Sequence, residues 1–197
     1  MTAEKRELRG SVRAARAAMT PAIRAAASRS VADRALALPA VIGARAVLAY
    51  AAAPEELDAS PLVKALRARG ARIAYPRVCR PGELSLHWCE DTALSPGYCG
   101  IAEPSAGAPE ADPEELDLVL VPGTAFDPAC GRLGMGGGFY DRLLARLASA
   151  AFAVGLAFDE QIVSEVPTES HDVALDAVVT PTRTLMPGVD GDGLRRV

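Results

Sequence analysis

A run of apolar residues that leads directly into a glycine-rich segment constrains the fold more than any other feature. Leu118 to Val121 are consecutive apolar residues, a pattern typical of a strand that is buried on both faces. Such strands occur mostly in parallel sheets that are covered by helices. The glycines between 123 and 138 then lead into a helical pattern expected over 139–148. The segment predicts a strand–loop–helix unit of an α/β protein.

Helical and strand patterns alternate along the rest of the chain. Thr20 and Ser60 each precede a proline, so each is expected to cap the N-terminus of a helix. Pro76 is expected to end a strand, because proline cannot donate to a sheet. The expected helices span 7–18, 23–38, 62–69 and 139–148; the expected strands span 46–50, 73–76, 84–88, 117–122, 152–157 and 177–180, with a loop over 95–113.

The length of 197 residues fits one domain with a real core. We predict a single α/β domain over residues 1–186, a layered and mostly parallel sheet with helices on both faces. The glycines and proline at 187–197 predict a flexible tail.

Composition excludes several classes of protein. Lys and Arg number 21 against 25 Asp and Glu, a net charge of -4, which argues against a nucleic-acid-binding surface. No apolar stretch approaches the roughly 20 residues that a membrane span needs. The N-terminus mixes charges and has no apolar signal core, so we expect a cytoplasmic protein. Four cysteines without a C-x-x-C pair, with two histidines, make structural zinc improbable and predict reduced, packed thiols.

The glycine-rich segment has the composition of an anion-binding loop. Successive glycines let backbone N–H groups turn towards an anion, and a following helix N-terminus adds partial positive charge. Arg132 is expected to supply a full charge at the mouth of the loop. The segment is neither a Walker A loop nor a dinucleotide fingerprint, because no Gly-Lys-Ser/Thr follows and Phe139 replaces the last glycine. A tightly packed turn is the alternative, but the polar residues that flank the loop favour a phosphate site.

Two further charged clusters leave alternatives open. Lys5, Arg9 and Arg13 are spaced by four residues, so they form one stripe on a helix that is either solvated or holds an anion. The acidic cluster Glu55-Glu56-Leu57-Asp58 either complements a helix N-terminus or accepts hydrogen bonds from a nitrogen-rich ring. Spacing does not distinguish these alternatives.

Taken together, these segments resemble the 5-formyltetrahydrofolate cyclo-ligase family, also called 5,10-methenyltetrahydrofolate synthetases, from Lys5 to about Thr180. The segments that carry the resemblance are Lys5-x-x-x-Arg9, Tyr50 with Glu56-Leu57-Asp58, Gly100-Ile101-Ala102-Glu103-Pro104, the block from Val121-Pro122-Gly123 to Asp141-Arg142, and His171-Asp172 with Leu175 to Thr180. The resemblance implies the layered α/β fold that sugar-phosphate isomerases and CoA transferases share. It also implies ATP- and Mg²⁺-dependent closure of 5-formyltetrahydrofolate to 5,10-methenyltetrahydrofolate, through phosphorylation of the formyl oxygen and attack by N10.

The resemblance also implies roles for individual residues. Lys5 and Arg132 would act in catalysis, Glu56, Ala51 and Tyr140 would bind folate, and Asp141 and Asp176 would hold Mg²⁺. The implied ATP-binding residues are Lys5, Arg9, Arg132, Leu133, Gly134, Met135, Gly136, Gly137, Gly138, Phe139 and Tyr140. The partner would be a small molecule, with or without a polyglutamate tail, rather than nucleic acid or membrane, and the chain is expected to be a monomer.

Two positions depart from the family pattern on the folate side. Cys99 stands where an aromatic residue is usual, so neighbouring Tyr98 is expected to cover the folate instead. Ala59 stands where a threonine is usual. An inactive folate- or nucleotide-binding descendant and a sugar-phosphate isomerase are the alternative functions; the intact Lys5, Arg9 and glycine block argue against both.

Overall fold

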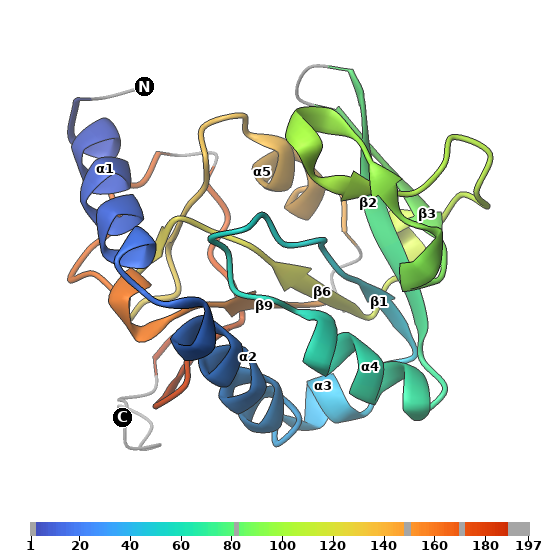
Figure 1. The fold of residues 1–197 in the computed structure, drawn as a ribbon, viewed down its shortest axis with the longest axis horizontal. Coiled ribbons are helices and arrows are strands. Elements are labelled where there is room, and N and C mark those ends of the chain that lie inside the picture. Colours follow the sequence, from blue (N-terminus) through green and yellow to red (C-terminus); the bar gives the residue numbers. More distant parts are fainter. Residues whose placement is uncertain (1–2, 81–82, 148–150, 170–171, 189–197) are drawn as a thin grey trace.

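A computed structural model describes residues 3–80, 83–147, 151–169 and 172–188 and shows one seven-stranded sheet (Figure 1). The strands lie in the order β11-β10-β9-β6-β1-β2-β3. Neighbours from β10 to β2 are parallel, whereas β11 and β3 are antiparallel strands at the two edges. The bounds are β1 Ala46–Leu48, β2 Arg72–Arg80, β3 Glu83–Trp88, β6 Leu118–Val121, β9 Phe152–Leu156, β10 Ala177–Val179 and β11 Thr184–Leu185. The predicted mostly parallel α/β sheet is confirmed.

Helices cover both faces of this sheet, as expected. One face packs against α2 and α4 together with the short α3, and the other against α5 (Figure 1). Consecutive residues of β6 alternate between the two cores: Leu118 and Leu120 face the first, Val119 and Val121 the second. The bounds are α1 Ala3–Ala17, α2 Pro21–Ala35, α3 Pro39–Ile42, α4 Ser60–Ala68 and α5 Phe139–Leu144. No helix in the described ranges is long and apolar enough to span a bilayer.

The strand order reverses direction between β1 and β6. From β1 the chain proceeds to β2 on one side, and β6, β9 and β10 follow on the other side. In open parallel sheets, ligands bind beyond the carboxyl ends of the strands at such a point. Here those ends lead into Tyr50 and Ala51 after β1 and into Pro122 and Gly123 after β6. The topology therefore specifies where a site should lie before any side chain is considered.

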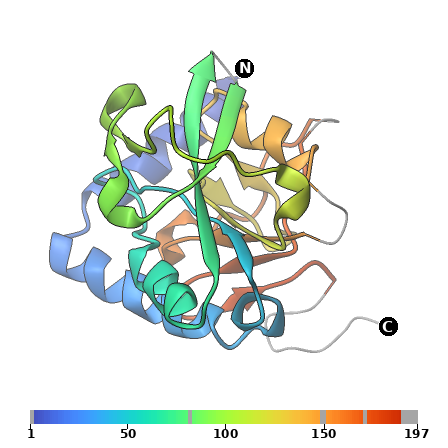
Figure 2. The ribbon, with the colours of Figure 1, turned by 90° about the vertical axis from the view of Figure 1, so that its right-hand side faces the viewer.

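The strand that contains Pro76 is longer than expected. β2 continues through Pro76 to Arg80 and pairs with β3 as a ribbon that extends beyond β1 (Figure 2). The Ala74 carbonyl accepts from Ala49 N–H on the β1 side, so Pro76, two residues on, directs its nitrogen to that same side. β1 has already ended there, and the missing N–H of proline breaks no ladder. The expectation that Pro76 ends the strand is therefore wrong.

Three other segments also differ from the sequence-based expectation. Ser60 does not cap α4. It lies within the first turn of the helix, and its N–H donates to the Asp58 carboxylate (2.9 Å). The loop expected over 95–113 contains a hairpin of β4 (Ser95–Pro96) and β5 (Ala102–Glu103). The glycine-rich segment contains a second hairpin, β7 (Ala125–Phe126) with β8 (Arg132–Leu133). Short 3₁₀ turns lie at Asp91–Ala93, Tyr98–Gly100, Pro113–Glu115 and Asp159–Gln161.

The start of α2 agrees with the prediction. Thr20 accepts from Ile23 N–H with Pro21 in the first turn, as predicted for α2. The tail expected over 187–197 lies outside the described residues from 189 onwards.

Candidate functional site

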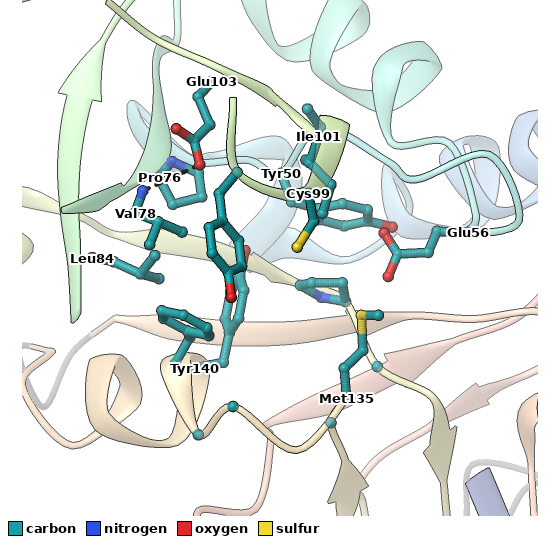
Figure 3. Close-up of a pocket in the computed structure, with 18 of the residues that line it drawn as sticks. Tyr50, Glu56, Pro76, Val78, Leu84, Cys99, Ile101, Glu103, Met135 and Tyr140 are labelled. Carbon is teal, nitrogen blue, oxygen red and sulfur yellow. Dashed lines mark hydrogen bonds between the residues drawn. The ribbon is translucent and has the colours of Figure 1, made fainter. Parts of the chain in front are cut away.

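A cavity of about 320 Å³ lies at the reversal point of the sheet. Ala51 and Pro122 border it where β1 and β6 end. Pro76, Val78 and Leu84, from β2 and β3, form an apolar wall, and Figure 3 shows Tyr140 and Met135 opposite the segment that carries Cys99 and Ile101. A volume of this size suits a small-molecule ligand, and its largely apolar lining suits a ring system.

The glycines of the loop lie against their neighbours too closely for side chains. A Cβ on Gly137 would lie 2.7 Å from the Phe139 ring, and one on Gly134 would lie 2.9 Å from Arg132 Nη1. Gly138, which precedes α5, has a φ of 64°, in the left-handed region. Gly134, Gly137 and Gly138 line the cavity, so exposed backbone forms part of its surface. The predicted anion-binding composition therefore sits at the cavity wall.

Arg132 lies deeper than the sequence suggested. Instead of standing at the mouth of the loop, it belongs to β8, and its side chain is only 4% exposed. One terminal nitrogen forms an ion pair with Asp141, and the other donates to the Pro122 carbonyl (3.2 Å). Its buried Nε has no partner among the described residues. A buried donor without a partner is unusual in a folded protein and fits a group that awaits a ligand.

Tyr140 presents a second buried polar atom with no partner in the described ranges. Its hydroxyl makes no hydrogen bond there, and the Arg132 guanidinium lies 5.7 Å from the ring centroid. Burial raises the pKa of Tyr140, and the charge of Glu56 raises it further, while Arg132 acts in the opposite direction. The hydroxyl therefore stays protonated at neutral pH and is available as a hydrogen-bond donor.

Glu56 enters the cavity from the side of β1. Its Oε2 accepts from Ala53 N–H (3.0 Å), a bond that closes a tight turn after β1. Tyr50, buried beside it, donates its hydroxyl proton to the Leu57 carbonyl (2.7 Å) and fixes the other end of this turn. Figure 3 shows the Glu56 carboxylate directed into the cavity next to the Tyr50 ring. Glu56, Ala51 and Tyr140 therefore line the same cavity.

The segment over the cavity carries Cys99, one of the two departures from the family pattern. Tyr98 lines the cavity and meets the Phe139 ring edge-on, with centroids 6.3 Å apart, beside Cys99. Glu103 anchors this segment, because its carboxylate accepts from Val78 N–H (3.3 Å) on β2 and pairs with Arg77. An aromatic ring therefore does cover the cavity one residue before Cys99.

Helix α1 approaches the glycine loop from outside the cavity. Arg9 Nε donates to the Gly134 carbonyl (2.8 Å). Lys5 is buried and lies 3.0 Å from both Asp172 and Glu169. Neither Lys5 nor Arg9 lines the cavity. Arg9 thus contacts the loop that was predicted to wrap a nucleotide, whereas Lys5 contacts Glu169 and Asp172.

Lys5, Arg9 and Arg13 do not lie along one side of α1, as the expected basic stripe requires. Helical residues rotate by about 100° each, so a spacing of four drifts by about 40° per step and leaves Arg13 about 80° from Lys5. Val12 and Arg16 stay close to the direction of Lys5, and both are buried, whereas Arg13 is exposed. The buried face of α1 therefore ends in Arg16, which the four-residue spacing missed.

Three further predicted site residues do not line the cavity. The Leu133 side chain packs with Val12 and Ala125 in a small apolar cluster, and Gly136 does not line the cavity. Asp176 precedes β10, and its carboxylate accepts from Ala153 N–H (2.8 Å). Because β10 runs parallel to its neighbours, this is the edge opposite to the cavity. The structure therefore separates Asp176 from Asp141, which corrects the expectation that both hold one Mg²⁺.

Of the two predicted Mg²⁺ ligands, only Asp141 is among the residues that line the cavity. Asp141 borders the cavity beside Arg132. No cluster of three or more His, Cys, Asp or Glu that could hold a metal ion occurs within residues 3–80, 83–147, 151–169 and 172–188.

Sequence reasoning missed several residues that shape the site. Glu169 and Asp172, which hold Lys5, come from a distant loop, and no local pattern predicts such a pairing. Glu103 was noted only as part of a motif. Arg16 could have been found, because Lys5, Val12 and Arg16 share a face when the helical angle, not a fixed spacing, is followed.

Comparisons with known proteins show the family to which the chain belongs. A model of the 5-formyltetrahydrofolate cyclo-ligase family matches residues 1–181. The 5-formyltetrahydrofolate cyclo-ligase of Escherichia coli (strain K12) is 35% identical over 178 residues, which cover 87% of this chain and 97% of that protein. The Haemophilus influenzae protein of the same name is 34% identical over 180 residues, 88% of this chain and 96% of its own.

Solved structures show the same fold. The 5,10-methenyltetrahydrofolate synthetase of Aquifex aeolicus aligns with a TM-score of 0.81 at 31% identity, over 98% of this chain and 96% of its own. That of Mycoplasma pneumoniae aligns with a TM-score of 0.75 over 90% and 99%; at 21% identity it supports the fold alone.

Proposed function

Because this chain belongs to the 5-formyltetrahydrofolate cyclo-ligase family, we propose that its cavity holds 5-formyltetrahydrofolate while an ATP-dependent reaction closes it to 5,10-methenyltetrahydrofolate. One observation carries the proposal: the apolar cavity and the glycine loop adjoin at Arg132. The buried Nε of Arg132 has no partner among the described residues. An apolar cavity suits the folate ring, and the loop with its buried cation suits phosphate.

The chemistry explains why one protein must bind both molecules side by side. The formyl carbon on N5 belongs to an amide, so it is a poor electrophile and its oxygen is a poor leaving group. ATP supplies the phosphoryl group that turns this oxygen into a leaving group. N10 then attacks the carbon, the proton of N10 passes to a phosphate oxygen or to water, and phosphate departs with the former formyl oxygen. N10 is already a usable nucleophile, so no protein side chain is required as a general base. The protein is left with positioning and charge neutralisation.

The described residues fit the phosphates of ATP. Arg132 carries a full charge, its buried Nε donor has no partner among the described residues, and Gly134, Gly137 and Gly138 expose backbone. Arg9 holds the loop from outside through the Gly134 carbonyl, and Lys5 lies one turn before it on α1. We assign Arg132 the stabilisation of charge that develops during phosphoryl transfer and Lys5 a supporting positive charge.

Asp141 fits Mg²⁺ in the same place. It is a partly exposed carboxylate at the N-terminal turn of α5, beside the loop proposed for phosphate. Mg²⁺ commonly uses one or two protein carboxylates with phosphate and water. We propose Asp141 as its ligand and leave Asp176 out of the site.

Folate binding falls to the other side of the cavity. Glu56 presents a carboxylate acceptor for the N–H groups of the pterin, and Tyr140 presents a protonated hydroxyl. Ala51 is small and lets a flat ring approach the end of β1. Tyr98 and Phe139 supply aromatic surface.

We propose that the enzyme works as a cytoplasmic monomer on folate with or without a polyglutamate tail. Four free cysteines suit a reducing compartment. Of the large apolar side chains exposed in the described residues, Tyr98 and Met135 border the cavity, while Ile23, Ile42 and Val173 belong to separate segments. Such scattered residues do not form the apolar patch of an obligate dimer.

The decisive test follows the methenyl product by absorbance. The chain is mixed with 5-formyltetrahydrofolate and Mg²⁺, with ATP present or omitted. We expect the chromophore to appear only with ATP. Folded protein that binds ATP and folate without forming product would instead indicate an inactive descendant of the family.

A further inference from the structure

Two arginines from different helices hold the glycine loop, residues 134–138, by its carbonyl oxygens. Arg9 of α1 donates from Nε to the Gly134 carbonyl (2.8 Å). Arg142 of α5 donates from Nη2 to the Gly137 carbonyl (2.5 Å). Neither arginine lines the cavity, whereas Gly134 and Gly137 both do. The two guanidinium groups therefore contact the loop on the side that faces away from the cavity.

The backbone donors of this loop are not used by the protein. No N–H group from Met135 to Gly138 donates a hydrogen bond to another residue in the described ranges. These residues are exposed or half-buried, so water or a ligand can accept from them. A run of such donors around a concave surface is an arrangement that binds anions. The protein thus holds the acceptors of the loop and leaves its donors available.

Peptide geometry connects the held carbonyls with the available donors. In a trans peptide, the C=O group and the N–H group of the next residue point in opposite directions. The described residues contain no cis peptide bond. Because the Gly137 carbonyl faces Arg142, the Gly138 N–H points away from Arg142, on the cavity side that Gly138 lines. Arg142 therefore determines the direction of this donor, as Arg9 does for the Met135 N–H.

The composition of the loop explains why such contacts are needed. Four of the residues from 134 to 138 are glycines, which lose more conformational freedom on ordering than any other residue. Arg142 lies directly against this backbone, because a Cβ on Gly138 would lie 2.9 Å from its Nη1. The arginine is exposed, so its hydrogen bond competes with water and contributes little to global stability. Its effect is local, on the orientation of the loop.

We propose that Arg142 is a positioning residue for ATP, which holds the Gly137 carbonyl and thereby directs the Gly138 N–H at the phosphates. This rests on the proposed binding of ATP phosphate at the loop. A second group in the same cavity supports a ligand there, because the buried Nε of Arg132 has no partner in the described part of the chain. Arg132 supplies charge, and the N–H groups supply direction. Arg142 acts through the loop from outside the cavity.

The test measures ATP binding without folate, by titration calorimetry, for Arg142→Ala, Arg142→Lys and Arg146→Ala. Arg146 is exposed just after α5, so its substitution removes the same charge nearby. We expect Kd for ATP to rise about fivefold in Arg142→Ala. It should change less than about twofold in Arg142→Lys, which keeps a donor, and in Arg146→Ala. In the absorbance assay, Arg142→Ala should raise KM for ATP similarly and leave KM for 5-formyltetrahydrofolate within about twofold.

Salt distinguishes a directed hydrogen bond from a general effect of charge. Between about 0.1 M and 0.5 M salt, the ratio of Kd for Arg142→Ala to that for wild type should stay constant, because salt mainly screens distant charges. A ratio that falls to one at high salt would overturn the proposal, as would an equal loss in Arg146→Ala. A rise in both KM values together with a lower urea midpoint would make Arg142 a structural residue and would also overturn it.

The wild-type chain separates this proposal from the proposed function. A wild-type chain that binds no ATP and forms no product would refute the proposed function. If the wild-type chain binds ATP and forms product, and Arg142→Ala binds ATP with the wild-type Kd, only the role of Arg142 is overturned.

Discussion

The two edges of the parallel sheet use acidic residues in opposite ways. At the edge where the strands begin, the Asp117 carboxylate accepts from Arg45 and Ala46 N–H, and Asp176 accepts from Ala153 N–H. At the edge where β1 and β6 end, Glu56 and Asp141 border a cavity. The first pair completes the backbone hydrogen bonding of neighbouring strands, whereas the second pair faces space for a ligand.

This difference shows how the fold separates stability from function. Near the cavity, Arg132 Nε and the Tyr140 hydroxyl are buried without partners in the described residues. Unsatisfied buried groups cost free energy, and natural proteins tolerate them mainly where binding will satisfy them. Substitutions at the two edges should therefore affect different measurements.

The largest effect is expected at the cavity edge, for Arg132→Ala. Removing a donor that stabilises developing charge typically costs about 10²–10³ in turnover, and we expect a loss of this size in kcat. Stability should fall by about 1–3 kcal/mol, because the partly exposed Asp141 loses its partner but can be hydrated. Turnover in the absorbance assay and urea unfolding measure the two effects.

A matched control is available nearby. Arg146→Ala removes the same charge from an exposed position just after α5 and should leave kcat unchanged. Turnover of Arg132→Ala within twofold of wild type would remove Arg132 from the ATP site.

At the opposite edge, the expected effect is on stability alone. Asp117→Ala should lower the free energy of unfolding by about 1 kcal/mol, and Asp176→Ala by somewhat less, because Asp117 serves two backbone N–H groups and Asp176 serves one. Both variants should keep wild-type kcat and an unchanged Mg²⁺ requirement. The exposed Glu114→Ala is the control for loss of a negative charge. A raised Mg²⁺ requirement in Asp176→Ala would return Asp176 to the metal site.

Much of this architecture follows from the sequence, because its signals are local. The apolar run Leu118 to Val121 requires burial on both faces, and the glycines after it require a close backbone approach. Thr20 followed by Pro21 fixes the start of α2. These features depend on neighbouring residues and on general stereochemistry, so the buried strand and the cap of α2 were predicted correctly.

The sequence does not show at which edge of the sheet a residue lies or which distant residues it contacts. Asp141 and Asp176 look equivalent as sequence, yet each lies at a different edge of the sheet because one lies in the first turn of a helix and the other precedes a strand. Arg132 appeared to be a loop residue because the β7–β8 hairpin pairs only two residues on each side. The partners of Lys5 lie more than a hundred positions along the chain, and only the fold brings them to α1.

The smallest expected effect concerns Lys5 and its dependence on pH. Burial by itself lowers the pKa of Lys5, but hydrogen bonds and charges from Asp172 and Glu169 outweigh it and raise the pKa above its usual 10.5. A base whose pKa is raised on folding stabilises the protein fully below the unfolded value, and this contribution is lost as pH rises through the folded value. The difference in unfolding free energy between wild type and Lys5→Gln should therefore be constant from pH 7 to about 9.5 and then shrink by up to about 1 kcal/mol. The same substitution at the exposed Lys64 serves as the control. A difference that grows at alkaline pH would mean that burial, not the two carboxylates, dominates at this end of α1.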